Sequence, residues 1–333
     1  MRATPSLVIQ TSFLGDVVLT TPLLRRLAQR GPVTVVTTPV AAPLLQGHPD
    51  VARLVAYDKR GADAGISGFV RLANALSTSA PDAVAYLAQG SHRSGALARA
   101  AGYQHRIGLA TSTGRIWYTT ALATTEGMHH AERLWRLAGD EAPSADALRP
   151  HLVPAATHDD AAVALLQAHG AMDEPLVALA PGSVWGTKRW PHYAELAGAI
   201  RGMRPVVVGS RDDAGIAARV VAAAPHAIDA TGRLPLLATA ALIARCRAVV
   251  TNDSLPLHLA SAMDIPTVAI FGPTSPTFGF GPLASRSEVV EHTRLECRPC
   301  HRHGPPSCPL GHFRCMNDLD VPQVLQALDR MTR

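Results

Sequence analysis

The sequence predicts an α/β protein made of two doubly wound parallel sheets, each covered by helices. Short β-branched and aliphatic runs alternate along the chain with segments rich in Ala and Leu that have a helical pattern, which is the rhythm of βαβ units. That rhythm breaks once, near residues 145–175, where Pro, Ala and Asp dominate. A chain of 333 residues is long enough for two domains on either side of this break, each with its own core.

The elements follow from hydrophobic periodicity. Before the break, strands are expected at 7–10, 33–37, 53–57, 83–87 and, with a weaker pattern, 106–109. The segments TTPLLRRLAQR, VAAPLLQGHP and FVRLANALSTS between them predict helices. After it, the helical segment AAVALLQAHG precedes expected strands at 176–180, 205–209, 248–251 and 267–271, and DVPQVLQALDRM predicts a final amphipathic helix.

Composition limits the class of protein. A hydrophobic content of 47% with 17% charged residues is typical of a folded globular chain. The formal net charge of +5 suits an anionic small substrate or an anionic membrane surface, and without a long Lys/Arg run no nucleic acid partner is expected. We expect no transmembrane helix, because no 18-residue apolar stretch is free of charges and breakers. We also expect a cytoplasmic protein, because the short apolar run near the N-terminus leads into Gly-Asp and a helical pattern, without a small-residue cleavage site, and is read as a first strand.

The first strand is followed by Gly15 and a carboxylate, Asp16. On these residues alone, a helix-start role is favoured, since an acid in the first turn complements the helix dipole. Doubly wound sheets also bind ligands beyond the carboxyl ends of their strands. A role for Asp16 as a catalytic base therefore stays open.

Two segments of the second half have the residue types of an anion site. In PGSVWGTKRW, Ser183, Thr187 and Lys188 follow a strand and could cradle a phosphate, although an ordinary surface loop is equally consistent. In TNDSLPLHLASAMD, Asp253 or Ser254 is expected to cap a helix whose free amides attract an anion, and His258 lies one turn further on. The alternative is a plain capping pair with a buried structural histidine.

The cysteine-rich segment CRPCHRHGPPSCPLGHFRC has the ligand number of a tetrahedral structural zinc site. A C-x2-C pair is followed by two further cysteines, and the four are Cys297, Cys300, Cys308 and Cys315. In a cytosolic protein such crowding favours metal over disulfides. An iron–sulfur cluster and a thiol-rich loop without metal are the alternatives.

The segments FLGDVVLTTPLLRRL, PGSVWGTKRWPHYAELA and TNDSLPLHLASAMDIPTVAIFGPT, with the cysteine segment, resemble the bacterial lipopolysaccharide heptosyltransferases of glycosyltransferase family 9, closest to the heptosyltransferase II branch. The resemblance spans nearly the whole chain and implies a GT-B fold, in which two Rossmann-like domains face a central cleft. It implies an acceptor domain at 1–160 and a nucleotide-sugar domain at 172–318 with the cysteine-rich loop 297–315. Residues 319–333 would form a helix that packs back toward the N-terminal domain.

The resemblance also implies an inverting transfer of heptose from ADP-L-glycero-β-D-manno-heptose to the heptose on Kdo–lipid A, without a catalytic metal. The reaction would take place at the cytoplasmic face of the inner membrane of a Gram-negative bacterium, with which the enzyme would make peripheral contact. Asp16 matches the family's catalytic base and Lys188 its donor-side lysine. The other donor-side assignments are Ser183, Thr187, Asp253, Ser254, His258 and, as a looser match near the nucleoside, Asp212.

One departure from the family pattern concerns the donor. The family often has a small residue where Leu255 stands, and Pro256 has no N–H to offer a diphosphate. Proline in the first turn does not prevent the helix. The identity of the donor sugar therefore stays open.

Basic side chains of the first domain would hold the anionic acceptor, because arginine binds phosphates and carboxylates in a bidentate manner. The candidates are Lys59, Arg60, Arg93, Arg106 and Arg115. Each of them alone could equally be an ordinary surface charge.

Three other functions were weighed. A related GT-B transferase with another nucleotide-sugar or acceptor stays open. A non-catalytic interaction module built on the cysteine loop is disfavoured, because it would need neither Asp16 nor the Lys188–His258 set. An NAD-dependent oxidoreductase is disfavoured because no G-x-G-x-x-G follows an expected strand.

Overall fold

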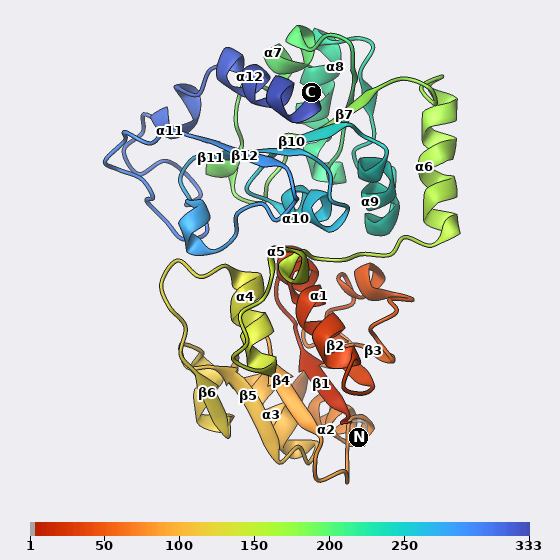
Figure 1. Ribbon diagram of the computed structural model, residues 1–333, viewed down its shortest axis with the longest axis vertical. Coiled ribbons are helices and arrows are strands. Elements are labelled where there is room, and N and C mark those ends of the chain that lie inside the picture. The colour runs from red at the N-terminus through yellow and green to blue at the C-terminus, as the bar shows by residue number, and fades with distance from the viewer. Residues whose placement is uncertain (1–3) are drawn as a thin grey trace. The chain divides into compact units, whose positions relative to one another are not determined.

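The computed structural model describes residues 4–333 and divides into two compact units, residues 1–153 (unit 1) and 154–333 (unit 2). Both are α/β units with a parallel sheet, as Figure 1 shows. We describe each unit by itself.

Unit 1 is built on a six-stranded parallel sheet in the order β3-β2-β1-β4-β5-β6. Its central strand β1 is wholly buried, as expected for an aliphatic run in a sheet covered on both faces. The five strands expected before the break are confirmed within about two residues, and β6 is additional. The strands are β1 (Ser6–Ile9), β2 (Val33–Thr37), β3 (Arg53–Ala56), β4 (Val84–Leu87), β5 (His105–Leu109) and β6 (Thr120–Leu122).

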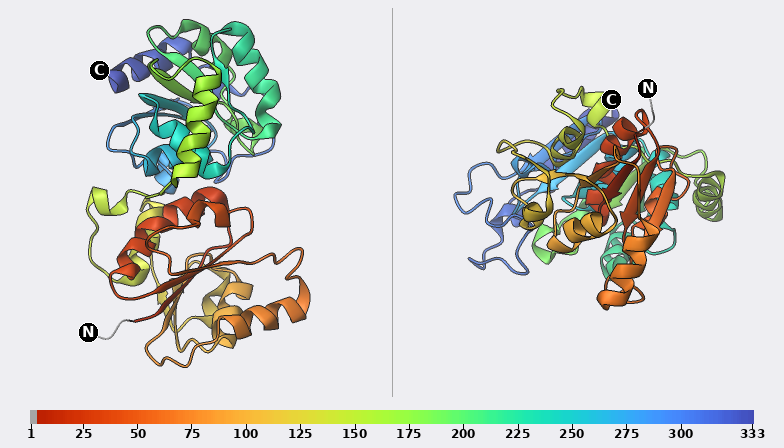
Figure 2. Two further views of the ribbon diagram at one scale, coloured as in Figure 1. Left: turned by 90° about the vertical axis from the view of Figure 1, so that its right-hand side faces the viewer. Right: turned by 90° about the horizontal axis from the view of Figure 1, so that it is seen from below.

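Helices cover both faces of this sheet. The helix α1 (Leu14–Ala28) packs with α4 (His130–Trp135) on one face, and α2 (Gly65–Ala75) packs with α3 (His92–Ala100) on the other. Figure 2 (left) shows α1 in red and α2 in orange on opposite sides of the sheet. The remaining segments are η2 (Thr113–Trp117), η3 (Arg136–Ala138) and α5 (Ala145–Leu148).

One expected helix is wrong. The segment VAAPLLQGHP forms only a single 3-10 turn, η1 (Ala42–Leu45). Pro43 lies in its first turn, and Gly47 has a φ of 71°, a left-handed backbone that ends helical structure. The segment is therefore too short to complete the turns that its apolar spacing suggests.

Unit 2 repeats the same topology. Its six parallel strands lie in the order β12-β11-β10-β7-β8-β9, so the first three strands run outward from the centre in one direction and the last three in the other, as in unit 1. The four expected strands are confirmed, and β9 and β12 are additional. The strands are β7 (Leu176–Ala180), β8 (Arg204–Val207), β9 (Ile228–Asp229), β10 (Ala248–Asn252), β11 (Thr267–Phe271) and β12 (Ser287–Glu291).

The helices of unit 2 also form two layers. The first is α7 (Tyr193–Ala199), α8 (Ala214–Ala223) and α12 (Val321–Thr332), and the second is α6 (Ala156–Ala168), α9 (Leu236–Ala244) and α10 (Leu255–Ala262). Shorter turns are η4 (Gly186–Lys188), η5 (Arg211–Asp213), η6 (Pro276–Phe278) and α11 (Arg314–Asn317). Among the described residues, no helix is both long and apolar enough to cross a membrane.

The last helix, α12, contributes to the core of unit 2. It packs on β10, β11, β12 and α7 of its own unit. Its buried residues Val324, Ala327 and Leu328 belong to the core of unit 2. The apolar face of this amphipathic helix is thus used to cover its own sheet.

Candidate active site

In unit 1, Asp16 lies in the first turn of α1, directly after the carboxyl end of β1. The helix begins after Phe13, whose backbone is extended, and no side chain caps it. The Asp16 carboxylate accepts a hydrogen bond from Ser12 Oγ at 2.6 Å through Oδ2, and its side chain is 17% exposed. Among the hydrogen bonds of residues 4–333, no amide of α1 donates to this carboxylate. Asp16 is therefore not used as a cap.

An imidazole stands beside this carboxylate. His130 Nε2, at the start of α4, lies 3.8 Å from Asp16 Oδ1. Both side chains are largely buried, with 15% and 17% exposure, and α4 packs directly on α1. His130 was not among the predicted site residues, because nothing in the spacing of the sequence connects the start of α4 with the start of α1. Two consecutive histidines before an apolar helix were the only signal.

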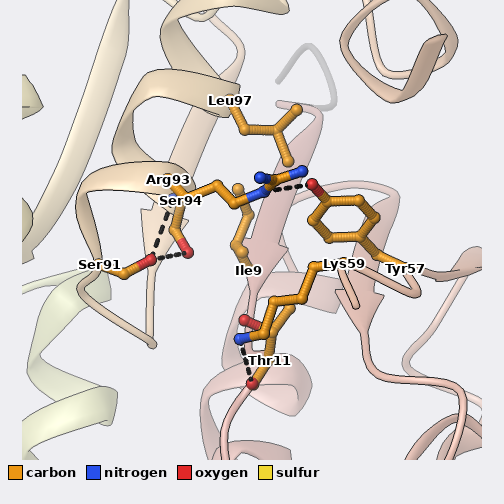
Figure 3. A pocket seen from close by; sticks show the side chains of 8 residues that line it. All are labelled: Ile9, Thr11, Tyr57, Lys59, Ser91, Arg93, Ser94 and Leu97. Carbon is orange, nitrogen blue, oxygen red and sulfur yellow. Dashed lines mark hydrogen bonds between the residues drawn. The ribbon is translucent and has the colours of Figure 1, made fainter. Parts of the chain in front are cut away.

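A cavity of about 220 Å³ opens beyond the carboxyl ends of β1, β3 and β4, as Figure 3 shows. Its charged lining residues are Lys59 and Arg93, two of the five basic residues expected to bind an anionic acceptor. The whole lining is Ile9, Thr11, Tyr57, Lys59, Ser91, Arg93, Ser94 and Leu97. The cavity is therefore a cationic pocket with hydroxyl groups and an apolar back wall.

The two cationic side chains of this pocket, Arg93 and Lys59, donate hydrogen bonds to neutral groups. Arg93 Nε donates to the Tyr57 hydroxyl, and the guanidinium carbon lies 5.3 Å from the centre of that ring. Lys59 Nζ donates to the carbonyl of Thr11 at 3.3 Å. Burial lowers the pKa of Lys59 below its usual range, and Arg60 and Arg93 lower it further. With no carboxylate in the lining, an anion in the pocket would relieve this repulsion.

The other three basic candidates lie outside the pocket lining. Arg106 donates to the carbonyls of Trp117 at 2.6 Å and of Tyr103 at 2.5 Å, and so holds η2 to β5. Arg60 and Arg115 are exposed. The structure thus brings together Lys59 and Arg93 but not the full predicted set.

In unit 2, the central feature is a buried ion pair. Lys188 Nζ, from the loop after β7, donates to Asp253 Oδ2 at 2.6 Å, and the two side chains are 11% and 10% exposed. Thr274 Oγ1, from the loop after β11, donates to the same oxygen at 2.8 Å. Asp253 therefore orients Lys188 and does not cap α10, which was the plainer of our two expectations for it.

Asn252 organises the backbone around this pair. It ends β10 and is fully buried. Its Nδ2 donates to the carbonyl of Pro181 at 2.8 Å, and its Oδ1 accepts from the backbone N–H of Trp190 at 3.2 Å. The side chain thus holds both ends of the loop that carries Lys188. Asn252 was not predicted as a functional residue, because an asparagine before Asp-Ser in the sequence resembles part of a helix N-cap.

The expected helix start is at Ser254, the residue that caps α10 by position. Its backbone is extended, and its hydroxyl is buried without a hydrogen-bond partner among the described residues. Pro256 lies in the first turn, as expected, and His258 is buried one turn further along. An unsatisfied buried hydroxyl at a helix start is a group that a bound anion could satisfy.

The remaining donor-side candidates have distinct surroundings. Thr187 is buried and donates from its hydroxyl to the carbonyl of Pro305 at 2.5 Å. Ser183 Oγ accepts from the Trp185 N–H at 3.4 Å. Asp212 is exposed, whereas its neighbour Asp213 is buried and accepts hydrogen bonds from the N–H and hydroxyl of Ser210, the N-cap of η5. Asp213 thus shapes the loop after β8, and Asp212 faces solvent.

The cysteine-rich segment covers this part of unit 2. Gly304 has a φ of 85°, and a Cβ placed on it would lie 3.1 Å from the Lys188 side chain. Arg298 donates to the carbonyls of Gly272, Phe271, Thr274 and His292 and to the Glu291 carboxylate. The segment is therefore fastened to the ends of β11 and β12, next to the Lys188–Asp253 pair.

The four thiols of this segment are free and differ in environment. Cys315 is buried, and desolvation with the nearby Cys300 thiol raises its pKa to about 11. Hydrogen bonds from backbone amides, that of Phe313 first, lower the pKa of Cys308. Over residues 4–333, the sulfur atoms do not form a set within 4.8 Å of one another. The thiols are neighbours, but the loop would have to contract to bind one ion tetrahedrally.

A different trio does meet that distance limit: His48, Asp50 and His151 of unit 1. His48 is buried, and both of its ring nitrogens have protein partners. Nε2 bonds the carbonyl of His151 at 3.0 Å, and Nδ1 accepts from the Asp50 N–H at 3.2 Å. These contacts hold residue 151 near η1, and His48 has no nitrogen left for an ion.

Comparison with known proteins decides the family. The sequence profile described as glycosyltransferase family 9 (heptosyltransferase) matches residues 69–309. The chain belongs to glycosyltransferase family 9. This family 9 chain is 30% identical to lipopolysaccharide heptosyltransferase 2 of Salmonella typhimurium, with 97% of each chain covered. The enzyme is therefore a glycosyltransferase.

Solved structures agree with the fold. Escherichia coli ADP-heptose lipopolysaccharide heptosyltransferase II is 26% identical, with a TM-score of 0.78 over 99% of this chain and 98% of that one. A family 9 glycosyltransferase from Veillonella parvula has a TM-score of 0.84 at 23% identity, over 100% of this chain and 98% of that one. The expected α/β fold with two Rossmann-like domains, the GT-B class, is confirmed.

Proposed function

We propose that this family 9 enzyme transfers heptose from ADP-L-glycero-β-D-manno-heptose to the inner core of lipopolysaccharide, with inversion at the anomeric carbon. The observation that carries the proposal is that each unit has a strand-end site, and that the two sites differ in chemistry. Unit 1 has a carboxylate near a cationic pocket, and unit 2 has a buried lysine beside a helix start. The likeness to heptosyltransferases 2 along 97% of the chain supports the sugar and the acceptor.

Asp16 is the general base of the proposed reaction. The acceptor hydroxyl oxygen attacks the anomeric carbon, its proton passes to the carboxylate, and the bond from that carbon to ADP breaks. The electron pair of that bond leaves with ADP. Ser12 occupies Oδ2, while Oδ1 has no hydrogen bond among the described residues and is available to take the proton.

Lys188 stabilises the leaving group. Its ammonium has three N–H donors, and Asp253 engages it at one carboxylate oxygen, which leaves donors for the diphosphate. The Ser254 hydroxyl and the N–H of Leu255, the first residue of α10, would supply neutral donors to the same charge. Pro256 has no N–H, and that of Leu257 donates to the Ser254 carbonyl. Ser183 and His258 complete the proposed donor contacts, and Thr187 acts indirectly by fixing the segment over Lys188.

The nucleoside is the least constrained part of the donor. Asp212 is proposed to contact it, since its carboxylate is exposed after β8 while that of Asp213 is used within η5. The reaction needs no catalytic metal in this proposal, because Lys188 and neutral donors offset the charge that develops on ADP. Transfer should therefore persist in the presence of EDTA.

The acceptor is an anionic glycolipid at the cytoplasmic face of the inner membrane. Lys59 and Arg93 would hold a carboxylate or phosphate of its core in the pocket of unit 1. Arg60 and Arg115, which are exposed, could contact more distant anionic groups. Arg106 would not contact the acceptor, because its guanidinium is engaged by backbone carbonyls.

We also propose that Cys297, Cys300, Cys308 and Cys315 bind a structural zinc ion. Four thiols within one short segment supply the right donor set. Elemental analysis of the purified protein should find one zinc per chain, and the Cys297→Ser/Cys300→Ser double variant should lose it. A chain that is fully active and contains no metal would refute this.

A panel of nucleotide-sugars tests the main proposal. Wild-type enzyme is incubated with deacylated heptosyl–Kdo acceptor and ADP-, UDP-, GDP- or CMP-activated sugars, and the products are analysed by mass spectrometry and by NMR of the new anomeric centre. We expect transfer from ADP-heptose with inversion. Transfer from a different nucleotide-sugar, with ADP-heptose inert, would favour the related-transferase alternative.

A further inference from the structure

Positive charge is concentrated in one part of unit 1. Residues 59–125 contain seven Lys or Arg and two Asp, a formal net charge of +5 that equals the net charge of the whole chain. From 83 to 125 there is no Asp or Glu. This segment forms α2, α3, η2 and the strands β4 to β6. The remainder of the chain is balanced in charge.

Exposed aliphatic side chains lie on the same elements. Ile66 and Val70 are one turn apart on α2 and are 83% and 48% exposed, and Ile116 on η2 is 72% exposed. The helix α3 packs against both α2 and η2, and we call the exposed surface of these three elements the docking face. The acid nearest to α2, Asp63, is paired with Arg71 at 2.6 Å.

The docking face adjoins the cationic pocket. The loop from β3 to α2 carries Tyr57 and Lys59, which line the pocket, and ends at Gly65, where α2 begins. Arg93 comes from α3, lines the same pocket, and contacts the carbonyl of Gly65 at 3.4 Å. A surface that contacts α2 therefore lies next to the site proposed for the acceptor sugar.

We propose that the docking face binds the surface of an anionic lipid bilayer, with Ile66, Val70 and Ile116 inserted among the acyl chains and the arginines at the level of the headgroups. This rests on the proposed function, whose acceptor is anchored by its lipid. Separate aliphatic side chains among exposed cations suit a fluid anionic surface. A protein partner would be expected to meet a continuous apolar core.

Vesicle flotation tests the proposal with full-length enzyme. Vesicles of phosphatidylethanolamine with phosphatidylglycerol should bind the wild type, and binding should fall as salt is raised, whereas phosphatidylcholine vesicles should not bind it. The Ile66→Ser/Ile116→Ser variant should bind the anionic vesicles at least about tenfold more weakly. Its fold is not at risk, because both side chains are exposed.

The matched control is Leu310→Ser, which removes an aliphatic side chain of 63% exposure from unit 2 and should leave vesicle binding unchanged. Equal binding by wild type and the Ile66→Ser/Ile116→Ser variant would overturn the proposal. Failure of the wild type to bind anionic vesicles would also overturn it, and an acidic protein would then be the more plausible partner of the docking face.

A kinetic comparison separates this proposal from the proposed function. The Ile66→Ser/Ile116→Ser variant should keep wild-type transfer to a deacylated acceptor in solution and lose about tenfold or more with the acylated acceptor in vesicles. Equal loss on both acceptors would overturn the docking role. No transfer to either acceptor by the wild type would instead refute the proposed function, whatever the vesicles show.

Discussion

The two sheets have the same strand order but opposite chemistry at their carboxyl ends. In unit 2, Asp253 receives Lys188 and Thr274 on a single oxygen, and Asn252 locks the surrounding loop. In unit 1, Asp16 receives one hydroxyl, and a histidine stands 3.8 Å away. A carboxylate committed to a cation serves as a fixed orienting group. The Asp16 carboxylate has no ion pair with a Lys or Arg among the described residues. A carboxylate that is not bound to a cation can accept a proton, and this supports the proposal that the base lies in unit 1.

Replacing Asp16 should have the largest effect. We expect Asp16→Asn to lower kcat by about 1,000- to 10,000-fold, at the upper end of what a general base contributes, with ADP affinity unchanged. Steady-state kinetics would measure kcat, and calorimetric titration would measure the affinity for ADP. Asp159→Asn, which removes an acid from the first turn of α6, controls for loss of helix-dipole stabilisation. An Asp16→Asn enzyme with near-normal kcat would refute the assignment.

Replacing Lys188, the cation of the ion pair in unit 2, should have the second-largest effect on kcat. Lys188→Ala should lower kcat by about 100- to 1,000-fold, because it removes a donor aimed at developing charge, and Lys188→Arg should restore part of the rate. Asp253→Asn should cost less than Asp16→Asn, because Asp253 only positions Lys188. If Asp253→Asn proved the more damaging of the two acid substitutions, the contrast between the units would be reversed.

Replacing Asn252, whose side-chain amide is buried in unit 2, should lower the stability of the protein. Asn252→Ala leaves the Pro181 carbonyl and the Trp190 N–H without partners, which should cost about 2–4 kcal/mol of unfolding free energy. Chemical denaturation would measure this change. Asn74→Ala, at an exposed position of α2, should change it by less than about 0.5 kcal/mol. A similar effect from both variants would mean that the loop after β7 is not held by Asn252.

Weakening the pocket of unit 1 should act mainly on the acceptor. Arg93→Met should raise the acceptor KM by about tenfold and leave the donor KM near its wild-type value, since one charge-assisted contact is lost. Initial rates over a grid of both substrates separate the two constants. A rise confined to the donor KM would contradict the assignment of this pocket.

The smallest effect should be on pH dependence. The pKa of Lys59 is lowered from its ordinary value of 10.5, mainly by burial. Acceptor binding should therefore weaken, by less than about tenfold, as the pH rises through this lowered pKa and the ammonium loses its proton. The same shift affects the free energy of unfolding. Charged Lys59 lowers this free energy at pH values below its pKa in the folded protein, and the loss is recovered as the pH rises toward 10.5. Lys59→Arg should abolish the alkaline rise in KM.

The central strands could be predicted, whereas of the four edge strands only β3 was predicted. Strands such as β1, β7 and β10 are buried aliphatic runs, and this pattern survives in the sequence. The unpredicted strands β6, β9 and β12 all lie at sheet edges. β6 and β12 are exposed or half-buried, and β9 has two residues, so none shows a hydrophobic pattern.

The same distinction holds for the candidate site. Asp16, Lys188 and Ser254 could be proposed from the sequence because each follows a predicted strand, where residue type alone suggests chemistry. The pairing of Lys188 with Asp253 and the approach of His130 to Asp16 depend on which strand ends and helices become neighbours. Tertiary packing sets these contacts, and no local pattern encodes them.

The hydrogen bonds of Arg298 bear on how the cysteine-rich segment can be exchanged between related proteins. One side chain fastens the cysteine-rich segment to four carbonyls and a carboxylate at the ends of β11 and β12. The sheet beneath does not need the segment for its own ladder. Thr187 and the backbone N–H of Cys300 add hydrogen bonds that hold the same segment, to the carbonyl of Pro305 and to that of Pro273. A graft of the segment between relatives would need to carry Arg298 with it, because Arg298 makes the largest share of these contacts.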